Sequence, residues 1–596
     1  MSSVAWALAR ASTSVVGSEC AAAFPALRQA CLRRLAEFEA QALANTAWAF
    51  ARAAWDEAAA GDGLPEALAA ASARVKTWPQ VQRLANTAWA LSRLAVTARQ
   101  GEAGQAFWPS CTASLLKDRL LQRCNQEELG GLAMGLALAA ALDAPLAAAV
   151  APEARGRLSG AGLGLRTMAG LAWSFATVRH CDVPLFQSIE TATLRSLACA
   201  DTTAATSGEG LKSLLGLSWA FSFAAGAGAA GPLPCAARHA LVAAGEALDR
   251  RRRGTVPALL PAAPAAAEGA PGLAAELLGG EAYALRKPSG WEVDTGEDPS
   301  LGGDQADGRR PLSDFLRAAM PGATIVEDVS HGRGLLHRLD ANSSGLVLGA
   351  RTYKAYYHLH WALHTYQIDR EYVALCHGLV DPRLAEVNKH LVLRGRASHV
   401  VDGAGLPALT RLKVLAHLGQ PKVVRGGQFS LLALSIHTGR QHQIRAHLRH
   451  CGHPVVCDAL YAPEHFQADR RWCPRNFLHR YRLAGLPLES EDVSPDGEAR
   501  TSLSRTASVV FALPADLAVA LRSLEPLDEA SAAAVRAWCG RDELNRDAPV
   551  PKPWDALLPL PSSRSGLVAG GCFDSRGQFR HTERQRDRKT ERQRDR

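Results

Sequence analysis

The segment Leu336-His-Arg-Leu-Asp-Ala-Asn-Ser-Ser-Gly-Leu-Val-Leu-Gly-Ala350 contains an acidic residue, a polar turn and an apolar strand in one continuous run. Asparagine, serine and glycine favour a tight turn, and the apolar residues that follow are typical of a buried strand. The pattern therefore places Asp340 at a strand edge beside the turn. An aspartate in such a turn is usually a cap, so this segment alone leaves both a structural and a catalytic role open.

A second segment, Thr438-Gly-Arg-Gln-His-Gln-Ile-Arg-Ala-His-Leu-Arg-His-Cys-Gly452, predicts a short helix. Thr438 and Gln441 have the spacing of a capping box, and the closing glycine suits a helix end. Arg445 and Arg449 lie one turn apart and would project together from this helix. Taken by itself, the pair is typical of a solvated basic face.

Short apolar segments bounded by Gly, Pro or polar turns surround both motifs, and such segments favour strands. They are residues 283–286, 345–350, 372–377, 429–437 and 508–513, the last of them after a Ser/Asp/Glu/Gly-rich insertion over 489–505. Together they predict an α+β domain with a mixed, mostly antiparallel sheet over residues 280–525.

Several motifs follow one another in a fixed order through this domain. They are Lys287-Pro-Ser-Gly290, His337-Arg-Leu-Asp340 with Ser344-Gly345, Arg370-Glu-Tyr372, Gly439-Arg-Gln-His-Gln-Ile-Arg445 with Gly452-His-Pro454 and Asp458, and Leu478-His479. In order and approximate spacing the set resembles the RluA-like RNA pseudouridine synthases. The resemblance implies an enzyme that isomerises a specific uridine of ribosomal or transfer RNA to pseudouridine. It implies no cofactor and no metal, and we expect a monomer.

The resemblance also implies a role for each matched residue. Asp340 is similar to the family's nucleophilic aspartate, which attacks the ribose C1′ or stabilises its departure from uracil. Arg445 is similar to the arginine that pairs with this carboxylate, and an opposite charge nearby lowers a carboxyl pKa. Tyr372 matches the tyrosine that stacks on uracil and assists proton removal from C5. The expected substrate contacts are Arg338, which enters the RNA stack as the target base leaves it, Leu478, an apolar wall of the pocket, and His337 and Gln443.

Four positions depart from the family pattern. The family commonly has Thr where Ser343 stands, Lys where Arg370 stands, Thr where Gln441 stands and Gly where Cys457 stands. The first two departures keep a hydroxyl and a positive charge, and the last two concern turn and cap geometry more than chemistry. We therefore expect an active enzyme with an altered substrate fit.

Two alternatives to a pseudouridine synthase are a metal-binding protein and a non-catalytic RNA-binding factor. In the first, a metal would be bound by His442, His447, His450, Cys451, His453 and Cys457, but this set has neither an H-E-x-x-H arrangement nor a C-x-x-C pair. In the second, the chain is a non-catalytic RNA-binding or maturation factor that uses the synthase domain as a platform. Intact Asp340, Tyr372 and Arg445 argue against the second alternative, and a turnover measurement decides it.

The first 230 residues follow a different pattern. Leu43-Ala-Asn-Thr-Ala-Trp-Ala-Phe-Ala51 returns as Leu84-Ala-Asn-Thr-Ala-Trp-Ala-Leu-Ser92, and weaker copies surround Trp6, Met134, Trp173 and Trp219. Spacings of about 40 residues are typical of helical-repeat arrays. Within one copy, apolar residues recur with the period of a helix. Residues 1–230 are therefore predicted to form an all-α helical-repeat solenoid.

The Asn-Thr-Ala-Trp-Ala pattern resembles the octotricopeptide and heptatricopeptide repeats of organellar RNA-binding proteins. The resemblance implies that the concave face binds single-stranded RNA in a mitochondrion or plastid, although a role as a protein-binding surface or scaffold stays open. For the tryptophans we prefer a place in the core between repeats over a role in stacking on bases.

The remaining segments are interpreted from composition. Residues 231–279 are rich in Pro, Ala and Gly and predict an interdomain linker, whereas residues 526–596 predict a C-terminal extension with a disordered basic tail. The formal charge of the chain is +9, but residues 580–596 hold eight basic and four acidic residues and so supply 8 − 4 = +4 of it. The rest of the charge is weak evidence for a nucleic acid.

Cellular location is interpreted from the cysteines and the hydropathy. The 13 cysteines form no C-x-x-C pair and follow no secretory signal, which favours a reducing compartment. The longest apolar run, residues 129–142, is too short to span a bilayer. We expect an intracellular, soluble protein without membrane contact. The start of the chain lacks transit-peptide character and is already repeat-like, which leaves open whether the N-terminus is truncated.

Overall fold

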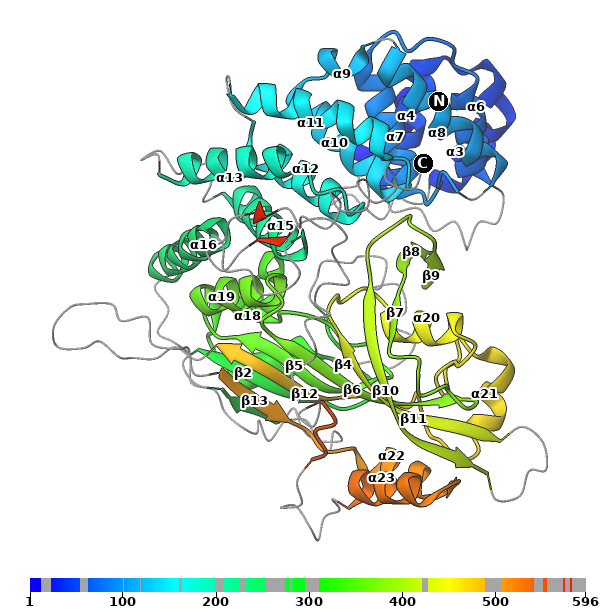
Figure 1. Cartoon of the computed structure of the whole chain (residues 1–596), viewed down its shortest axis with the longest axis vertical. Helices are drawn as coiled ribbons and strands as arrows, with labels where there is room; N and C mark the ends of the chain where they lie inside the picture. Colours follow the sequence, from blue (N-terminus) through cyan, green and yellow to red (C-terminus); the bar gives the residue numbers. More distant parts are fainter. Residues whose placement is uncertain are drawn as a thin grey trace, which may run out of the picture. The chain divides into compact units, whose positions relative to one another are not determined.

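The structure is a computed structural model and is shown in Figure 1. It describes residues 1–11, 23–53, 63–99, 101–117, 119–159, 163–198, 207–224, 232–252, 274–278, 281–294, 310–420, 427–487, 506–540, 550–554, 572–573 and 579–580. The chain divides into two compact units. The first comprises Met1–Ala240, His390–Pro407 and Ser562–Arg596, and the second comprises Leu241–Lys389 and Ala408–Pro561.

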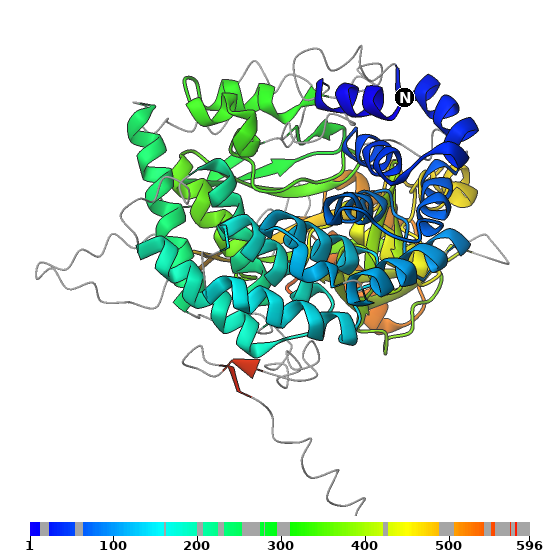
Figure 2. The ribbon, with the colours of Figure 1, turned by 90° about the horizontal axis from the view of Figure 1, so that it is seen from above.

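The first unit contains two sets of helices that alternate along the chain (Figures 1 and 2). The motif-bearing set is α1 (Ser2–Ala11), α4 (Ala40–Arg52), α7 (Val81–Arg93), α10 (Gln126–Leu138), α12 (Leu165–Thr177) and α15 (Gly208–Ala224). The second set is α3 (Phe24–Arg34), α6 (Leu64–Ala73), α8 (Glu102–Lys117), α11 (Ala144–Ser159) and α13 (Val183–Ala198), with the short α9 (Leu120–Arg123) after α8. Each helix of the first set contacts the next helix of that set, and the second set behaves in the same way. The prediction of a helix-rich N-terminal region is therefore confirmed.

Small residues allow this close packing of helices. Leu43 and Ala47 of α4 are buried, and so are the matching Leu84 and Ala88 of α7. On α10, a Cβ atom added to Gly135 would lie only 3.1 Å from the backbone of Ala88. The apolar stripe read from the repeated motif is thus the stripe by which neighbouring helices meet.

The tryptophans of the motif differ in how far they are buried. Trp219 is 8% exposed and Trp6 is 39% exposed, whereas Trp48, Trp89 and Trp173 lie between these limits. Rings of neighbouring repeats approach one another, with centroids 6.4 Å apart for Trp6 and Trp48 and 6.3 Å apart for Trp173 and Trp219. The predicted contact between tryptophans of neighbouring motif copies is therefore observed in these two pairs, and Trp219 is the one buried member among these five tryptophans.

The linker predicted over residues 231–279 contains a long helix, α16 (Pro232–Arg251), so the linker prediction is wrong for this stretch. Pro232 and Pro234 lie in the first helical turn, where a missing N–H group leaves no hydrogen bond unmade, and the alanines that follow favour helix. The boundary between the two units falls inside α16. The predicted linker residues 253–273 lie outside the described residues.

The second unit is organised around one mixed sheet with the strand order β1-β2-β5-β12-β6-β11-β10-β14, in which β13 also pairs with β12 and β7 with β10. The strands are β1 (Ala274–Leu277), β2 (Ala282–Lys287), β5 (Ser344–Ala350), β6 (Asp369–His377), β7 (Glu386–Asn388), β10 (Leu409–Gly419), β11 (Gln428–Ile436), β12 (Leu478–Pro487), β13 (Thr506–Val510) and β14 (Glu525–Pro526). Among these described strands, the pair β5–β12 is parallel and the other pairs are antiparallel. The predicted α+β fold with a mixed sheet is confirmed.

Helices and short strands complete the second unit. They are β3 (Trp291–Glu292), β4 (Arg310–Pro311), α17 (Leu312–Ala319), α18 (Thr324–Glu327), the 3₁₀ segment η4 (Val329–Gly334), α19 (Tyr353–His364), α20 (Gln443–His450), α21 (Pro463–Asp469), α22 (Ala515–Arg522) and α23 (Glu529–Cys539). Trp538 of α23 packs in the same core as Phe477 and Tyr481, and its ring centroid lies 4.9 Å from that of Tyr481. The predicted domain end at residue 525 is therefore too early, because α23 supplies part of the core.

The predicted disordered tail lies almost entirely outside the described residues. Two short strands near the end of the chain are described, β15 (Cys572–Phe573) and β16 (Phe579–Arg580), and they pair with each other. Within the described part of the chain, no helix combines the length and the apolar character required to cross a lipid bilayer.

The hairpin of β8 (His390–Arg394) and β9 (Ala397–Val401) groups with the first unit, although its sequence lies between β7 and β10. Val392 and Val401 share a small apolar cluster with Ala95, and the N–H group of Gly405 donates to the carbonyl of Leu138. The sequence interpretation, which treated residues 280–525 as one catalytic domain, missed this separation because it depends on long-range packing.

Candidate active site

Asp340 lies in the loop between η4 and β5, at the place predicted from the sequence. The N–H group of Ser343 donates to the Asp340 carbonyl at 3.0 Å and closes a tight turn. Ser344 then begins β5, and its hydroxyl bonds to Nδ1 of His479 on the neighbouring strand β12 at 2.9 Å. The prediction of a carboxylate at a strand edge beside a turn is confirmed.

Lys287, at the end of β2, fixes the loop that follows Asp340. Its side chain is fully buried, and its Nζ donates to the carbonyls of Pro288, Ala341 and Ser343 at 2.9, 3.0 and 2.6 Å. Burial lowers the pKa of Lys287 to about 7, although the negative charge of Asp340 acts in the opposite direction. The opening motif of the domain thus supports the loop that presents the carboxylate.

The turn after Lys287 adds two more hydrogen bonds to the same loop. The Ser289 hydroxyl donates to the carbonyl of Asn342 at 3.1 Å, and the N–H group of Gly290 donates to the carbonyl of Ala341 at 2.9 Å. Gly290 has a φ of +87°, a conformation that a glycine adopts at little cost.

Arg445 of α20 bridges two carboxylates. Its Nη1 donates to Oδ2 of Asp340 at 2.7 Å, while its Nε and Nη2 donate to the two oxygens of Asp458 at 2.7 and 2.8 Å. The side chain of Asp458 is fully buried, and it also accepts from the N–H groups of Leu460 and Tyr461, both at 3.0 Å. The bidentate contact fixes the plane of the guanidinium, so Arg445 presents its remaining edge to Asp340.

This arrangement keeps Asp340 ionised. Burial by itself raises the pKa of the Asp340 carboxyl, but the charges of Arg445 and His442 and the hydrogen bond from Arg445 act together against burial and hold the pKa below its ordinary value. The charge of Arg338, two residues away, acts in the same direction. At neutral pH the site therefore contains a carboxylate that is fixed in orientation and partly withdrawn from water.

His442 and Tyr461 lie beside this ion pair. Nε2 of His442 is 3.7 Å from Oδ1 of Asp340, its Nδ1 is 3.2 Å from the Tyr461 hydroxyl, and the guanidinium carbon of Arg445 lies 4.9 Å from the Tyr461 ring centroid. Burial lowers the pKa of His442, so its ring is neutral near pH 7. Sequence reasoning treated His442 only as a candidate metal ligand. Among the described residues, no group of three or more His, Cys, Asp or Glu side chains is placed to hold a metal ion.

Tyr372 of β6 lies opposite Arg480 of β12 in the sheet. Nε of Arg480 donates to the Tyr372 hydroxyl at 2.8 Å, and its guanidinium carbon lies 4.8 Å from the ring centroid. The same guanidinium reaches Nδ1 of His337 at 2.8 Å and the Leu346 carbonyl at 2.9 Å. Sequence reasoning missed Arg480, although it directly follows the Leu478-His479 motif.

Gly345 permits this approach of β12. A Cβ atom added to Gly345 would lie 2.5 Å from the backbone N and O atoms of Arg480, and its φ of +135° disfavours any other residue. The Ser-Gly pair after Asp340 thus allows the parallel pairing of β5 and β12.

The other predicted substrate contacts occupy different surroundings. Leu478 is buried and begins β12. Both ring nitrogens of His337 face N–H donors, namely Arg480 and, at 3.3 Å, the backbone of Leu348. Burial and the charge of Arg480 lower the pKa of His337 well below its ordinary value. Arg338 is half-buried in the loop before Asp340.

Gln443 is held by protein groups on both halves of its amide. Its Nε2 donates to the Leu409 carbonyl and the Thr410 hydroxyl, both at 3.0 Å. Its Oε1 accepts from the Thr438 hydroxyl at 2.8 Å and from the N–H group of Arg440 at 3.1 Å. This geometry ties the start of α20 to β10 and does not favour the substrate contact expected for Gln443.

Two of the departures from the family pattern have a clear setting. Cys457 has a φ of +59°, and its N–H group donates to Asp469 at 2.7 Å, so this position does concern turn geometry. Arg370 is buried, and its guanidinium donates to the His437 carbonyl at 2.6 Å. A Cβ atom added to Gly439 would lie 2.7 Å from the same guanidinium, so the first glycine of that motif provides room for Arg370.

Comparisons with known proteins match the region of the chain that contains this site. Residues 285–450 match the protein family described as RNA pseudouridylate synthase. Ribosomal large subunit pseudouridine synthase C of Haemophilus ducreyi is 31% identical over 205 residues, which cover 33% of this chain and 57% of the relative. Ribosomal large subunit pseudouridine synthase D of Neisseria meningitidis is 35% identical over 170 residues, which cover 26% of this chain and 42% of the relative.

A solved structure, Human RNA Pseudouridylate Synthase Domain Containing 1, is 20% identical, covers 50% of this chain and 99% of its own, and has a TM-score of 0.31. The chain spans about half the length of the two bacterial relatives, and the family match includes Asp340, Tyr372 and Arg445. The resemblance of this segment to RluA-like pseudouridine synthases is confirmed. The family match does not extend to the helices of the first unit.

Proposed function

We propose that this chain, whose residues 285–450 match the pseudouridine synthase family, is an enzyme that isomerises a specific uridine in RNA to pseudouridine. The observation that carries the proposal is the position of Asp340, whose carboxylate is held ionised by Arg445 while Arg445 is itself held by the buried Asp458. A carboxylate in this state is suited to act at an electrophilic ribose carbon.

The proposed reaction conserves every atom of the uridine. The uridine is first flipped out of its stack, and the bond between N1 and C1′ breaks while the Asp340 carboxylate attacks or stabilises C1′. The detached uracil turns, and a bond forms between C5 and C1′ while the bond between C1′ and the Asp340 carboxylate, where one has formed, breaks and restores the free carboxylate. The proton leaves C5, and N1 acquires one. No oxidation or reduction takes place.

The surrounding residues are assigned proposed roles in this scheme. Tyr372 packs on the uracil and assists proton removal, and Arg480 fixes its hydroxyl. Leu478 forms an apolar wall, and Arg338 takes the place of the flipped base. For His337 and Gln443 we propose positioning roles, because their polar atoms already contact protein groups. These assignments rest on the family resemblance together with the geometry described above.

The substrate is proposed to be ribosomal RNA, because both bacterial relatives are named for the large ribosomal subunit, and transfer RNA is the alternative. The helices of the first unit are proposed to form a repeat solenoid that binds single-stranded RNA. Their recurring motif and their contacts from each helix to the next support this proposal. The organelle suggested by the repeats, a mitochondrion or plastid, remains part of the proposal.

The decisive experiment compares pseudouridine formation by the parent and by Asp340→Asn, which keeps the shape of the side chain and removes its charge. Pseudouridines are mapped in total RNA from cells that contain either protein. We expect the modification to disappear while RNA affinity stays within about twofold. Asp381→Asn is the matched control, since Asp381 pairs only with the exposed Arg383 in the described structure.

Turnover of Asp340→Asn within tenfold of the parent contradicts the assignment of the nucleophile. RNA binding without any turnover by the parent favours the second candidate, a non-catalytic RNA-binding or maturation factor.

A further inference from the structure

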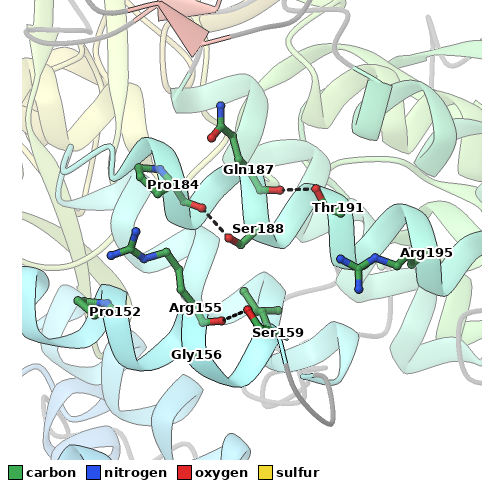
Figure 3. Close-up of a pocket in the computed structure, with 10 residues that line it drawn as sticks. Pro152, Arg155, Gly156, Ser159, Pro184, Gln187, Ser188, Thr191 and Arg195 are labelled. Atoms are coloured by element: carbon green, nitrogen blue, oxygen red, sulfur yellow. Dashed lines mark hydrogen bonds between the residues drawn. The ribbon is translucent and has the colours of Figure 1, made fainter.

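A pocket of about 500 Å³ lies between α11 and α13 in the first unit (Figure 3). Arg155, Gly156 and Ser159 line it from α11, and Gln187, Thr191 and Arg195 line it from α13. Residues three and four positions apart share one face of a helix, so each helix turns a single polar face toward the pocket. Neither the sequence motifs nor the proposed catalytic reaction explains this face.

The pocket is positively charged. Arg155 and Arg195 lie at opposite sides of it in the view of Figure 3, and the described residues that line it include no carboxylate. The nearby acidic side chains are engaged elsewhere: Glu153 accepts from Arg157 at 2.7 Å, and Glu190 accepts from the N–H group of Leu233 at 3.2 Å. The pocket therefore favours an anionic ligand.

Arg155 also has an unsatisfied donor. Its Nε is buried and has no hydrogen-bond partner in the described part of the protein. A buried donor without a partner is costly. Because this Nε is covered by protein atoms, an acceptor oxygen of a ligand would reach it only after the Arg155 side chain moves. Arginine is well suited to phosphate because its planar group offers several donors.

Hydroxyl groups give the pocket a second chemical character. The hydroxyls of Ser159, Ser188 and Thr191 each donate to a carbonyl of their own helix, at 3.1, 2.8 and 2.9 Å. Their protons are used, so their oxygens remain available as acceptors. A ligand that complements the pocket carries phosphate oxygens for the arginines and hydroxyl donors for these oxygens. The ribose-phosphate backbone has both, through its phosphates and its 2′-hydroxyl groups.

The residues that line the pocket also indicate that it does not recognise bases. No aromatic side chain is among the described residues that line it, so it offers no platform on which a base would stack. At Gly156, an added Cβ atom would meet no heavy atom within 4 Å, so the surface is open at this point. Such a site would hold the backbone of a strand independently of its sequence.

We propose that this pocket binds the ribose-phosphate backbone of a single-stranded segment of the RNA substrate. The proposal rests on the proposed function in one respect only, that RNA is the substrate. The pocket would hold the strand at a distance from the reacting uridine, and base-specific contacts would come from other surfaces.

The test is made on the full-length chain in the Asp340→Asn background, so that binding is measured without turnover. Fluorescence anisotropy is recorded with a single-stranded RNA oligonucleotide and with DNA of the same sequence over a range of salt concentrations. For Arg155→Gln with Arg195→Gln we expect RNA binding about tenfold weaker and a salt slope reduced by about one to two, because each lost phosphate contact lowers the slope by roughly one.

Two further variants keep the test independent of charge. Gly156→Leu adds volume at a position where a Cβ atom would meet no heavy atom within 4 Å, and leucine favours helix more than glycine does, so we expect the variant to fold. Thermal unfolding of the variant checks that weaker RNA binding is not a consequence of unfolding. Thr191→Val removes an acceptor and should reduce the preference for RNA over DNA. Arg34→Gln is the matched control, because Arg34 also lies in the second set of helices but pairs with Glu37 on the surface, and we expect parental binding.

Parental RNA affinity in both the double arginine variant and Gly156→Leu would overturn the proposal. So would equally weakened binding in Arg34→Gln, or binding of a phosphopeptide in place of RNA. Because the assay measures binding alone, failure of the proposed catalytic function would appear separately, as absent turnover in the parent.

Discussion

Arg445 in the second unit and Arg155 in the first are both arginines of helices, but their surroundings differ. Arg445 contacts two carboxylates, and three of its nitrogens have partners at 2.7–2.8 Å. Arg155 lines a pocket in which the described residues provide no carboxylate, and its Nε has no partner. An arginine that is satisfied within the protein orients a catalytic group, whereas an arginine left unsatisfied is available to a ligand.

The largest effect is expected when the satisfied arginine is removed. Arg445→Met leaves Asp340 and Asp458 without a counter-charge. Removing one preorganised electrostatic partner of a reacting group typically lowers turnover by about 10²- to 10³-fold, and we expect a loss of that size. Breaking the buried ion pair should also destabilise the fold by about 3–5 kcal/mol. The pKa of Asp340 should also rise, because Arg445 now lowers it. Since activity requires the ionised carboxylate, the acid limb of the pH–rate profile should move to higher pH.

The measurement is kcat/KM between pH 4 and 9, with Arg449→Met as control, because Arg449 is on the same helix and pairs with the half-exposed Glu464. If the pH–rate profile of Arg445→Met had the same height and midpoint as that of the parent, Arg445 would not orient Asp340. The functional contrast drawn above between Arg445 and Arg155 would then be wrong.

A smaller effect is expected when Arg445 keeps its charge and loses one partner. Asp458→Asn retains the shape of the side chain but gives the guanidinium a weaker partner, so Arg445 becomes less fixed in orientation. We expect kcat to fall by about tenfold, since charge-assisted hydrogen bonds are roughly twice as strong as neutral ones. Single-turnover kinetics with Asp381→Asn as the control measures this effect. A loss as large as that of Arg445→Met would show that Asp458 acts through folding.

Lys287 adds a third case to the comparison of Arg445 with Arg155. It is a buried cation whose hydrogen bonds go to carbonyl oxygens only. Burial lowers its pKa to about 7, below the value of about 10.4 expected in the unfolded chain. Below pH 7 both states bind the proton, and the cost of burying the charge is fully present. Between about pH 7 and 10.4 the unfolded chain binds more protons, so stability should rise with pH.

Thermal unfolding at pH 6 and pH 9 measures this effect. The parent should gain stability relative to Lys287→Met over this interval. A constant difference between the two proteins would mean that Lys287 stays charged when buried.

The smallest effect concerns the backbone beside Asp458. Cys457 has a φ of +59°, which costs a non-glycine residue about 1–2 kcal/mol, whereas the equally buried Cys376 lies in a regular strand. Cys457→Gly should therefore destabilise the protein by about 1 kcal/mol less than Cys376→Gly. Equal losses in chemical denaturation would show that the backbone at 457 carries no strain.

Local sequence patterns predicted the turns and helices of the site better than the contacts between residues that are far apart in the sequence. The turn at Asp340 and the glycine after the helix that carries Arg445 follow from local turn chemistry. The predicted capping box of Thr438 and Gln441 is wrong, because α20 begins at Gln443 after His442, whose side chain makes no capping hydrogen bond, while the Thr438 hydroxyl donates to Gln443. Arg480 was missed because its contact with Tyr372 depends on the pairing of β6 with β12, more than 100 residues apart. The pairing of Asp340 with Arg445 was anticipated only through the family resemblance, because spacing alone did not bring the two side chains together.

Composition misled the interpretation at the domain edges. Helix α16 was interpreted as linker because proline and glycine dominate the segments on both sides of it, although its own prolines lie in the first turn. Helix α23 was assigned to an extension because its alanine-rich sequence does not reveal that Trp538 packs against Tyr481. Both errors concern long-range packing, which local propensity does not encode.

The hydrogen bonds from Lys287, Ser289 and Gly290 to the loop after Asp340 all end on backbone carbonyls. These hydrogen bonds fix the path of the backbone at residues 341–343. The side chains of these residues take no part in them. In a saturation mutagenesis experiment, the half-buried position 341 and the exposed position 342 should accept many side chains, whereas the buried position 343 should accept only small ones. All three positions should reject proline, which alters the chain path. The loop would then be a place where related enzymes diverge in sequence without moving the carboxylate.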